Sequence, residues 1–406
     1  MDVQDPTATN YVVPPHVPAS LVYDFDHFNA PELTSQPQAR VSARLHADAP
    51  PIFWSPRQGG YWIVSRAEPA IDMLRQPELF SSLPTYNKAK DFDPPILPIQ
   101  SDPPLLDEYR RILNPVLAPG SVHRLESMVR DLATEIVGYL APRGECEFVT
   151  EVEAFPITIF LKLAGAPMAD RARLVKIAQK YARSPVFAER AAAVKELAAY
   201  LREKLAERRG APPDNLLARV ANAQVNGRPI TAVEEEGMAT LIFLGGLDTV
   251  KSALSFAFAY LAKHPEQYAK LVQNPALIPG AVEELLRVAG TSTPERGASH
   301  DFEYRGIQFH QGDRVVFLCQ IYGMDPEFVS NPHEIKFDRD VAMHLAFGAG
   351  PHRCIGSHLA RMEIRLFIEE WIKRIPAFGT RNDEEIRTEC GIVWSPAEVN
   401  LVWPVS

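Results

Sequence analysis

Apolar residues recur three and four positions apart through most of the chain after residue 107, the spacing that places them on one face of an α-helix. This periodicity predicts helices over residues 122–141, 170–183, 188–208, 279–289 and 355–374. The longest predicted helix, residues 232–263, has no internal proline and is apolar around much of its circumference. Because such a helix is stable only when it is buried, we expect it at the centre of the fold.

Strand patterns are short and few. Residues 60–64 (GYWIV) and the segment 302–317 favour strands, and Asn-Gly within residues 224–231 (QVNGRPIT) is typical of a hairpin turn. The first hundred residues are otherwise rich in proline, so we expect them to be irregular, with residues 1–13 as a disordered tail. Since repeats and flexible linkers are not evident, residues 1–406 are predicted to form a single, mainly α-helical domain with a small β region.

The composition limits the classes of protein to which the chain can belong. It has 42 Lys and Arg against 51 Asp and Glu, a net charge of −9, whereas nucleic-acid-binding domains are usually basic. No run approaches the roughly eighteen continuous apolar residues of a membrane helix, and the polar first residues do not resemble a secretory signal. The four cysteines are scattered, which fits a reducing compartment. We therefore expect a cytoplasmic protein that binds neither nucleic acid nor a membrane.

Cys354 stands in a glycine-rich segment, FGAGPHRCIG (residues 347–356), directly before a predicted helix. Glycines allow close backbone approach, and the amides and dipole of a helix N-terminus stabilise a thiolate. A thiolate on such a loop, open on one side to a flat partner, suits an axial ligand of haem iron. Two alternatives are an inert buried cysteine and a zinc ion held by His352, Cys354 and His358, although structural zinc sites usually have four ligands in paired short spacings.

Two further motifs lie on predicted helices. Glu284 and Arg287, three positions apart, form either a surface ion pair or a link within the core. The glycine pair 245–246 lies inside the longest helix, where each glycine costs roughly 1 kcal/mol relative to alanine, so a compensating role is expected. Asp248 and Thr249, which follow, could relay protons, or the threonine hydroxyl could donate to the carbonyl four residues earlier.

Together these motifs resemble a known family. Residues 347–356 fill every fixed position of F-G-x-G-x-H-x-C-x-G, the haem-binding signature of the cytochromes P450. Residues 284–287 (ELLR) match the E-x-x-R of that family, and residues 245–249 (GGLDT) resemble its oxygen-activating segment. Residues 14–18 (PPHVP) and 21–26 (LVYDFD), among other stretches, are similar to the soluble bacterial camphor hydroxylase family, and this likeness covers essentially the whole chain.

The resemblance implies the triangular, mainly helical cytochrome P450 fold with haem b. It also implies a monomer that takes electrons from NADH through a ferredoxin reductase and a two-iron ferredoxin. Arg183 is expected to pair with Asp248 on the distal side of the haem. The positions that match by motif are Cys354 for the iron; Asp248 and Thr249 for protons; Arg110, Arg296 and His352 for the haem propionates; and Glu284 with Arg287 for the core behind the haem.

The chain departs from the camphor hydroxylases where a tyrosine hydroxyl would orient a ketone substrate. Pro94, which has no donor, stands at that place, and the nearest phenol is that of Tyr86. A site held by shape discriminates less than one built on a hydrogen bond, so we expect a compact apolar terpenoid. The bicyclic ether 1,8-cineole is the leading candidate, and camphor or an ionone-like terpenoid is the alternative. Candidate wall residues, which also fit plain core packing, are Tyr86, Ile96, Ile99, Leu244, Ser292, Ile392 and Val393.

The surface that would face the electron donor also differs. Where the family carries arginine, this chain has Glu78 and Asp107, so we expect a ferredoxin different from that of the camphor system. Arg75, Arg111 and Arg353 could still form a basic patch. The expected function is hydroxylation of an unactivated C–H bond of a small terpenoid with O2. The alternatives are a haem-thiolate sensor that binds ligands without turnover and a peroxide-driven haem-thiolate enzyme.

Overall fold

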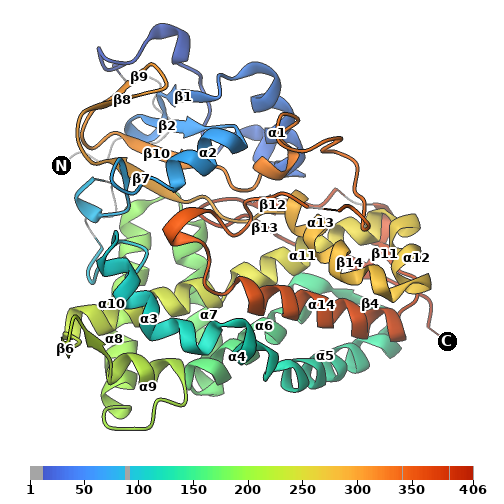
Figure 1. The fold of residues 1–406 in the computed structure, drawn as a ribbon. Coiled ribbons are helices and arrows are strands. Elements are labelled where there is room, and N and C mark those ends of the chain that lie inside the picture. Colours follow the sequence, from blue (N-terminus) through green and yellow to red (C-terminus); the bar gives the residue numbers. More distant parts are fainter. Residues whose placement is uncertain (1–11, 87–91, 341, 384, 406) are drawn as a thin grey trace.

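The computed structural model describes residues 12–86, 92–340, 342–383 and 385–405, so the tail expected over residues 1–13 lies almost entirely outside the described residues. Most helices gather in the lower part of Figure 1, and the largest sheet lies above them with two short helices. The helices are α1 (Pro37–Asp48), α2 (Ala67–Leu74), α3 (Leu105–Leu117), α4 (Pro119–His123), α5 (Glu126–Leu140), α6 (Phe148–Ala164), α7 (Arg171–Arg183), α8 (Phe187–Glu207), α9 (Leu216–Ala221), α10 (Ala232–Gly246), α11 (Thr249–Lys263), α12 (Pro265–Gln273), α13 (Ile278–Val288) and α14 (Ser357–Arg374).

The strands are short, as predicted. Gln224–Val225 and Arg228–Pro229 confirm the hairpin expected around Asn-Gly. The strands are β1 (Ile52–Ser55), β2 (Tyr61–Val64), β3 (Phe80–Ser81), β4 (Glu145–Glu147), β5 (Gln224–Val225), β6 (Arg228–Pro229), β7 (Glu295–Ala298), β8 (Phe302–Tyr304), β9 (Ile307–Phe309), β10 (Arg314–Phe317), β11 (Gly379–Thr380), β12 (Thr388–Glu389), β13 (Ser395–Pro396) and β14 (Asn400–Val402).

The helical periodicity is largely confirmed. The helices predicted at 170–183, 188–208, 279–289 and 355–374 are α7, α8, α13 and α14, with small shifts at their ends. The helix predicted at 122–141 begins later, as α5. The expectation of irregular structure in the first hundred residues was wrong, because α1 and α2 lie there. Pro37 is the first residue of α1 and Pro69 lies in the first turn of α2, where no backbone N–H is needed for a helical hydrogen bond.

The long central helix is interrupted after its glycine pair. α10 ends at Gly246 and α11 begins at Thr249, with Leu247 and Asp248 between them. Among the residues that the structure describes, the stretch Ala232–Lys263 alone is apolar and long enough to cross a membrane, with a hydropathy of 1.4, and 56% of that window is buried inside the fold. Counting continuous apolar residues did not reveal this stretch, because residues such as Lys251 interrupt the run.

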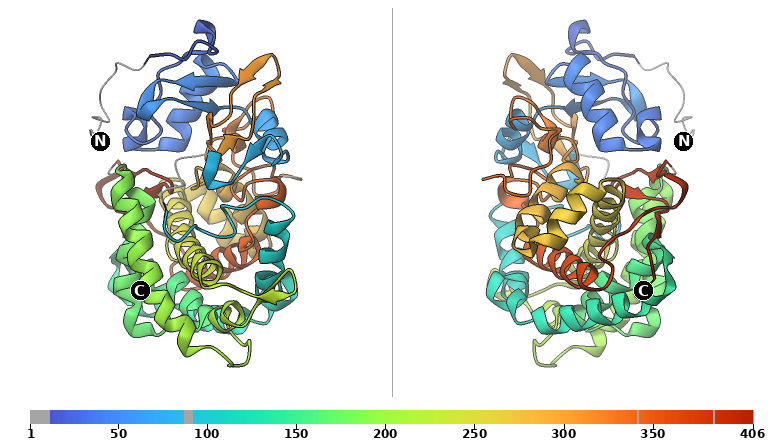
Figure 2. Two further views of the ribbon diagram at one scale, coloured as in Figure 1. Left: turned by 90° about the vertical axis from the view of Figure 1, so that its left-hand side faces the viewer. Right: turned by 90° about the vertical axis from the view of Figure 1, so that its right-hand side faces the viewer.

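The largest sheet joins distant parts of the chain. Its strand order is β1-β2-β10-β7-β3, and β10 runs parallel to β2 with Val315 opposite Trp62. In Figure 2 the blue N-terminal segments lie beside the orange segment of residues near 310. Trp62, Ile63 and Val64 are fully buried, which explains the continuous apolar run of β2. The sheet thereby fixes β7, which carries Arg296, against the N-terminal part of the chain.

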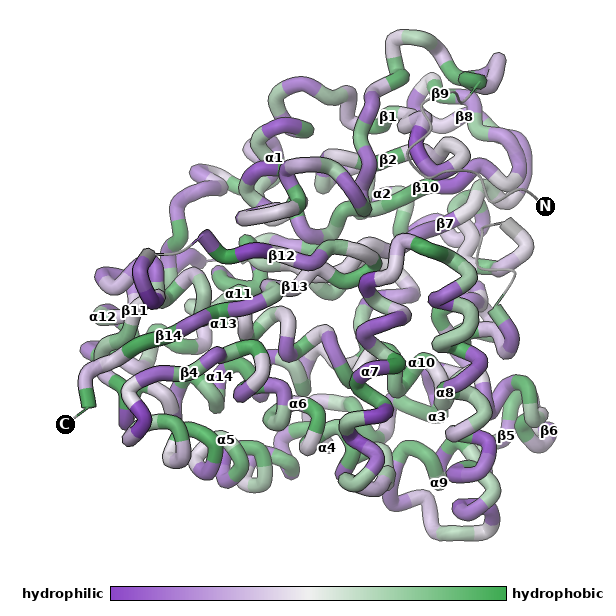
Figure 3. The backbone as a smooth tube through the Cα atoms, turned by 180° about the vertical axis from the view of Figure 1, so that it is seen from behind, coloured by the Kyte–Doolittle hydropathy of each residue, from purple (hydrophilic) through white to green (hydrophobic). Residues whose placement is uncertain are grey.

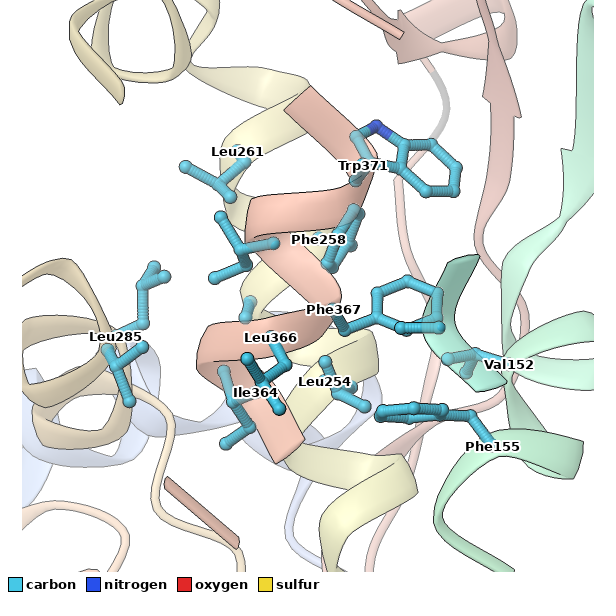
Figure 4. Packing of buried hydrophobic residues seen from close by; sticks show 14 of the residues in the cluster. Val152, Phe155, Leu254, Phe258, Leu261, Leu285, Ile364, Leu366, Phe367 and Trp371 are labelled. Carbon is cyan, nitrogen blue, oxygen red and sulfur yellow. The ribbon is translucent and has the colours of Figure 1, made fainter. Parts of the chain in front are cut away.

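A large hydrophobic cluster surrounds α14 and α11. Figure 4 shows Phe258 of α11 between Phe367 and Trp371 of α14, with Phe155 of α6 at the edge of the group. The ring centroids of Phe258 and Trp371 are 4.9 Å apart, and those of Phe155 and Phe367 are also 4.9 Å apart. The outer helices α5 and α8 instead alternate between hydrophilic and hydrophobic residues in Figure 3. The core therefore anchors α14, the helix that follows Cys354, on a rigid base.

Candidate haem and substrate site

Two left-handed glycines shape the loop before α14. Gly348 and Gly350 have φ angles of 67° and 66°, which are conformations that glycine adopts without strain. A Cβ on Gly350 would lie 2.1 Å from the carbonyl oxygen of Leu74, so α2 packs directly on the loop. The amide of Cys354 donates to the carbonyl of Phe347 at 2.9 Å. The loop thus holds the sulfur-bearing residue by its backbone.

Cys354 is neither a buried core cysteine nor part of a zinc site. Cys354 is exposed, whereas Cys146 and Cys319 are buried, so it is not an inert core cysteine. No group of three or more His, Cys, Asp and Glu residues in the described ranges could hold a metal ion. The zinc site of His352, Cys354 and His358 is therefore not formed. The remaining interpretation is that Cys354 is a ligand for a cofactor that brings its own metal ion.

The electrostatic surroundings of the Cys354 sulfur are mixed. Although the residue has accessible surface, the protein atoms packed around its sulfur desolvate the thiol and raise its pKa. The amide of Gly356 and the charges of Arg110, Arg353 and Arg361 lower the pKa, but desolvation has the larger effect. The amide of Gly356, at the start of α14, thus favours the thiolate as expected, although desolvation has the larger effect. The same amide and arginines nevertheless supply the positive field that a metal-bound thiolate needs.

Arg296 and His352 are buried polar groups with few protein partners. Arg296 is 4% exposed and donates to the carbonyl of Glu295 at 2.8 Å, and burial lowers its pKa to about 10. His352 Nε2 is buried without a hydrogen-bond partner within the described ranges and lies 3.9 Å from the nearest Asp102 oxygen. Burial lowers the pKa of His352 to about 4. Buried donors of this kind are stable only when a ligand or water completes their hydrogen bonds.

Arg110 brings α3 to the same loop. It donates to the carbonyl of Arg353 at 2.9 Å, beside Cys354, and burial lowers its pKa. Neither Arg110 nor Arg296 forms an ion pair with a carboxylate in the part of the chain that the structure describes. The carboxylates of haem propionates would supply the missing partners, so these residues fit haem b. Sequence reasoning missed Asp102, which accepts from the Ser82 amide at 2.9 Å and lies beside His352.

The interruption between α10 and α11 exposes backbone inside the fold. Gly245 is exposed, and a Cβ added there would meet nothing within 4 Å, so a ligand can approach the helix at this point. The hydroxyl of Thr249 donates to the carbonyl of Gly245 at 2.8 Å. This is the bond to the carbonyl four residues earlier that the sequence offered as the alternative to proton relay. That bond uses the hydroxyl proton and leaves the oxygen lone pairs free to accept. The single helix predicted over residues 232–263 is therefore two helices, which are separated directly after the glycine pair.

Asp248 is buried between two cations. It is 2% exposed, and Arg183 Nη2 lies 2.9 Å from its Oδ2, which confirms the expected pair. Lys251 Nζ lies 3.1 Å from Oδ1 and 3.7 Å from Glu153 on α6. Sequence reasoning missed Lys251, although its spacing of three from Asp248 places both side chains on one helix face.

The Glu284–Arg287 pair is part of the core, not the surface. Both residues are 1% exposed, and the guanidinium forms two bonds of 2.7 and 2.9 Å with the carboxylate. Arg287 also donates to the carbonyls of Gly323 and Pro332 at 2.7 and 2.6 Å. Burial acts to raise the pKa of Glu284, but the bonds from Arg287 and from the Lys336 amide hold it below its usual value. The motif therefore ties α13 to the segment 323–339.

The candidate wall residues fall into two groups. Ile96 and Leu244 are 1% and 6% exposed and belong to one hydrophobic cluster, to which Ile355 also packs. Ser292 and Val393 pair in a β-bridge, and the Ile392 amide donates to the carbonyl of Ala182 at 2.9 Å.

The two remaining wall candidates are not placed with either group. Ile99 is 40% exposed, so it does not belong to the buried cluster of Ile96 and Leu244. The side chain of Tyr86 lies outside the described residues. Of the seven wall candidates, Ile96 and Leu244 thus share a hydrophobic cluster, and Ser292, Ile392 and Val393 lie at one β-bridge. That they surround a substrate stays a prediction.

A cysteine loop beside Arg110, a cation without an ion pair among the described residues, is the kind of site that a haem protein with a cysteine ligand requires. The cytochrome P450 family profile matches residues 157–398, and the chain belongs to this family of haem b monooxygenases. It is 33% identical to probable cytochrome P450 127A1 of Sinorhizobium fredii over 96% of this chain and 97% of the relative. It is 27% identical to linalool 8-monooxygenase of Pseudomonas putida over 85% and 90%. The crystal structure of CYP101J2 matches with a TM-score of 0.86 and 31% identity, over 97% of this chain and 100% of that one.

Proposed function

We propose that the protein hydroxylates a C–H bond of a small terpenoid, with Cys354 as the ligand of the haem iron. The observation that carries the proposal is the exposed Cys354 on its glycine loop, with the charge of Arg110 acting on it. Arg110 and Arg296 form no ion pair with a carboxylate among the described residues, and His352 Nε2 is buried without a hydrogen bond there, 3.9 Å from Asp102. These three residues would hold the propionates, and Glu284 with Arg287 would keep the surrounding core rigid. Haem b, when bound through a cysteine thiolate, supplies the oxidising chemistry with O2.

Asp248 and Thr249 handle protons in this proposal. The Thr249 hydroxyl, anchored on Gly245, holds a hydrogen-bonding oxygen at the exposed stretch of the central helix. Asp248 is the nearest carboxylate in sequence and is kept in place by Arg183 and Lys251. A carboxylate and a hydroxyl on adjacent residues can pass protons from the protein interior toward dioxygen, one of whose oxygen atoms leaves as water. A sensor or a peroxide-driven enzyme would have no use for this pair.

The substrate class follows from the wall and from the relatives. Ile96 and Leu244 are apolar, and Pro94 offers no donor, so shape rather than a hydrogen bond orients the ligand. The relative from Pseudomonas putida is named for linalool, a terpenoid. We therefore propose a compact terpenoid with 1,8-cineole as the first compound to test, within the camphor hydroxylase type of cytochrome P450.

A two-iron ferredoxin is the proposed electron donor in the cytoplasm, reduced by an NADH-dependent reductase. A hollow of about 330 Å³ lies outside the cysteine loop, and its lining includes Arg75, Arg353 and Arg361. These cations would attract the acidic surface of a ferredoxin. Glu78 and Asp107 are exposed, and we propose that they select a ferredoxin different from that of the camphor system.

Reduced protein treated with carbon monoxide provides the test of the haem ligand. We expect the red-shifted Soret band of a cysteine-ligated haem in the wild type and its loss in Cys354→Ser, with Cys390→Ser as the control. A Soret band that survives Cys354→Ser would overturn the proposal. Titration with 1,8-cineole, camphor and linalool then tests the substrate class through displacement of the iron-bound water. Turnover with a surrogate ferredoxin and reductase separates an enzyme from a sensor.

A further inference from the structure

Arg190 is a cation without an ion pair among the described residues. It lies in the first turn of α8, and its guanidinium carbon is 5.3 Å from the ring centre of Phe28 and 5.5 Å from that of Phe187. Its Nε is buried without a hydrogen-bond partner, and Arg190 forms no ion pair with another residue in the described part of the chain. Burial lowers the pKa of Arg190. A half-buried guanidinium between aromatic rings is therefore left with unused donors.

The charged groups near Arg190 do not use these donors. The carboxylate whose charge reaches Arg190 is that of Glu295, and Glu295 already accepts from Arg314 at 2.6 Å. Glu189, next to Arg190 on the helix, accepts from the Ser184 hydroxyl at 2.7 Å. A cation in the first turn also lies at the positive end of the helix dipole, which an anion would relieve.

A row of aromatic rings connects Arg190 with the proposed substrate wall. The ring centres of Phe187 and Phe92 are 5.0 Å apart, and those of Phe92 and Tyr181 are 5.9 Å apart. Phe92 and Tyr181 pack on the hydrophobic cluster that contains Ile96 and Leu244. A series of ring contacts thus links the cation to the cluster that contains two of the residues expected to surround the substrate.

We propose that Arg190 binds the carboxylate of an acidic terpenoid, whose hydrocarbon body lies along Phe187 and Phe92 toward Ile96 and Leu244. This inference rests on the proposed function: the residues around Ile96 and Leu244 still hold the hydrocarbon body by shape, and Arg190 adds a preference for terpenoids that carry a carboxylate at the end remote from the oxidised carbon. A guanidinium binds a carboxylate through two parallel hydrogen bonds, and the surrounding aromatic rings exclude water from that pair.

Calorimetric titration of the haem-loaded protein tests this with geranic acid and geraniol, which share a skeleton and differ in the carboxylate. We expect the wild type to bind the acid about tenfold or more tightly than the alcohol, since a hydrogen bond to a charged group is stronger than a neutral one. Arg190→Met should remove this preference and leave geraniol binding within about twofold, while Arg190→Lys should restore part of it. Arg173→Met is the matched control, because Arg173 lies over the ring of Tyr200 at 5.5 Å on the outer surface of α7.

Equal affinity for acid and alcohol in the wild type would overturn the role of Arg190. The same conclusion would follow if Arg190→Met kept the preference, or if Arg173→Met removed it to the same extent. Any of these results with an intact cysteine-ligated Soret band leaves the proposed function standing. A missing Soret band, in contrast, rejects the proposed function itself.

Discussion

Lys251 Nζ lies 3.1 Å from Asp248 Oδ1, and the two side chains are only 3% and 2% exposed. Asp248 lies in the interruption of the central helix, directly before α11, and Lys251 lies in the first turn of α11. Arg183 approaches Asp248 from α7 at 2.9 Å, so one buried carboxylate is bound by two cations from different helices. The ion pairs thereby fix the interrupted helix against its neighbours, where a free carboxylate would have to be solvated or protonated.

Lys251→Met should therefore destabilise the protein measurably. We expect the free energy of unfolding to fall by about 2–3 kcal/mol, less than the roughly 3–5 kcal/mol for an outright broken buried pair, because Arg183 still pairs with Asp248. Urea denaturation followed by circular dichroism gives the value. Lys336→Met is the control, since the Lys336–Glu334 pair is 3.0 Å long but 43% and 53% exposed. The free energy of unfolding of Lys336→Met should fall by less than about 1 kcal/mol. An equal fall in both variants would contradict the view that the buried position of Lys251 makes its ion pair important.

Arg287→Lys should damage the core more severely. The guanidinium reaches Glu284 and three backbone carbonyls, those of Gly323, Pro332 and Glu334. Lysine keeps the charge but has one nitrogen, so it cannot satisfy these acceptors together, and we expect a loss of about 3–5 kcal/mol. Thermal unfolding of the haem-loaded protein and the yield of bound haem provide the measurement.

Arg339→Lys is the comparison for that prediction. Arg339 also contacts Glu284, at 2.9 Å, but is 13% exposed. Its ammonium replacement can be hydrated, so the loss should be clearly smaller than that of Arg287→Lys. If the two variants lost the same stability, the arginine of the E-x-x-R motif would not be the centre of the network.

Local sequence patterns predicted the helices well and the tertiary relationships poorly. Periodicity predicted α7, α8, α13 and α14 because each buries one face, but it merged α10 and α11 into one helix because both are apolar. Periodicity could not show that β2 pairs with β10, because that pairing depends on residues about 250 positions apart. The cysteine loop was predicted as a unit, since its glycines, histidine and cysteine are contiguous. The roles of Lys251 and Arg190 were missed because they depend on residues that the fold, and not the local sequence, brings next to them.

The pH dependence of stability should reveal His27. Burial lowers its pKa to about 4, while its Nδ1 lies 2.8 Å from the Tyr61 hydroxyl. The unfolded chain therefore binds more protons than the folded chain between pH 4 and about 6.5, so stability rises with pH in this window. The contribution of His27 to the free energy of unfolding is complete above about pH 6.5. We expect about 2 kcal/mol of this contribution to be lost between pH 7.5 and pH 5.0.

The measurement compares His27→Gln with the wild type by urea denaturation at those two pH values. Glutamine can still bond to Tyr61 but does not titrate, so the difference between the two curves should shrink toward pH 5.0. His123→Gln removes an exposed histidine, with its side chain 81% exposed, and should leave the pH dependence unchanged. A His27→Gln variant with the full wild-type pH dependence would show that other groups cause it.

Thr249→Ala should separate electron consumption from product formation. The hydroxyl that bonds to the Gly245 carbonyl is lost, and with it the polar oxygen at the exposed stretch of the central helix. With ferredoxin and reductase supplied, NADH should still be oxidised, while hydrogen peroxide replaces much of the alcohol. The fraction of NADH that yields hydroxylated product should fall by about tenfold, which is modest for the loss of a positioned proton-transfer group. Thr240→Ala, a buried threonine on α10 whose hydroxyl has no hydrogen-bond partner among the described residues, should keep the wild-type ratio. Unchanged coupling in Thr249→Ala would exclude this residue from proton handling, and a matching loss in Thr240→Ala would point to a general effect on the helix.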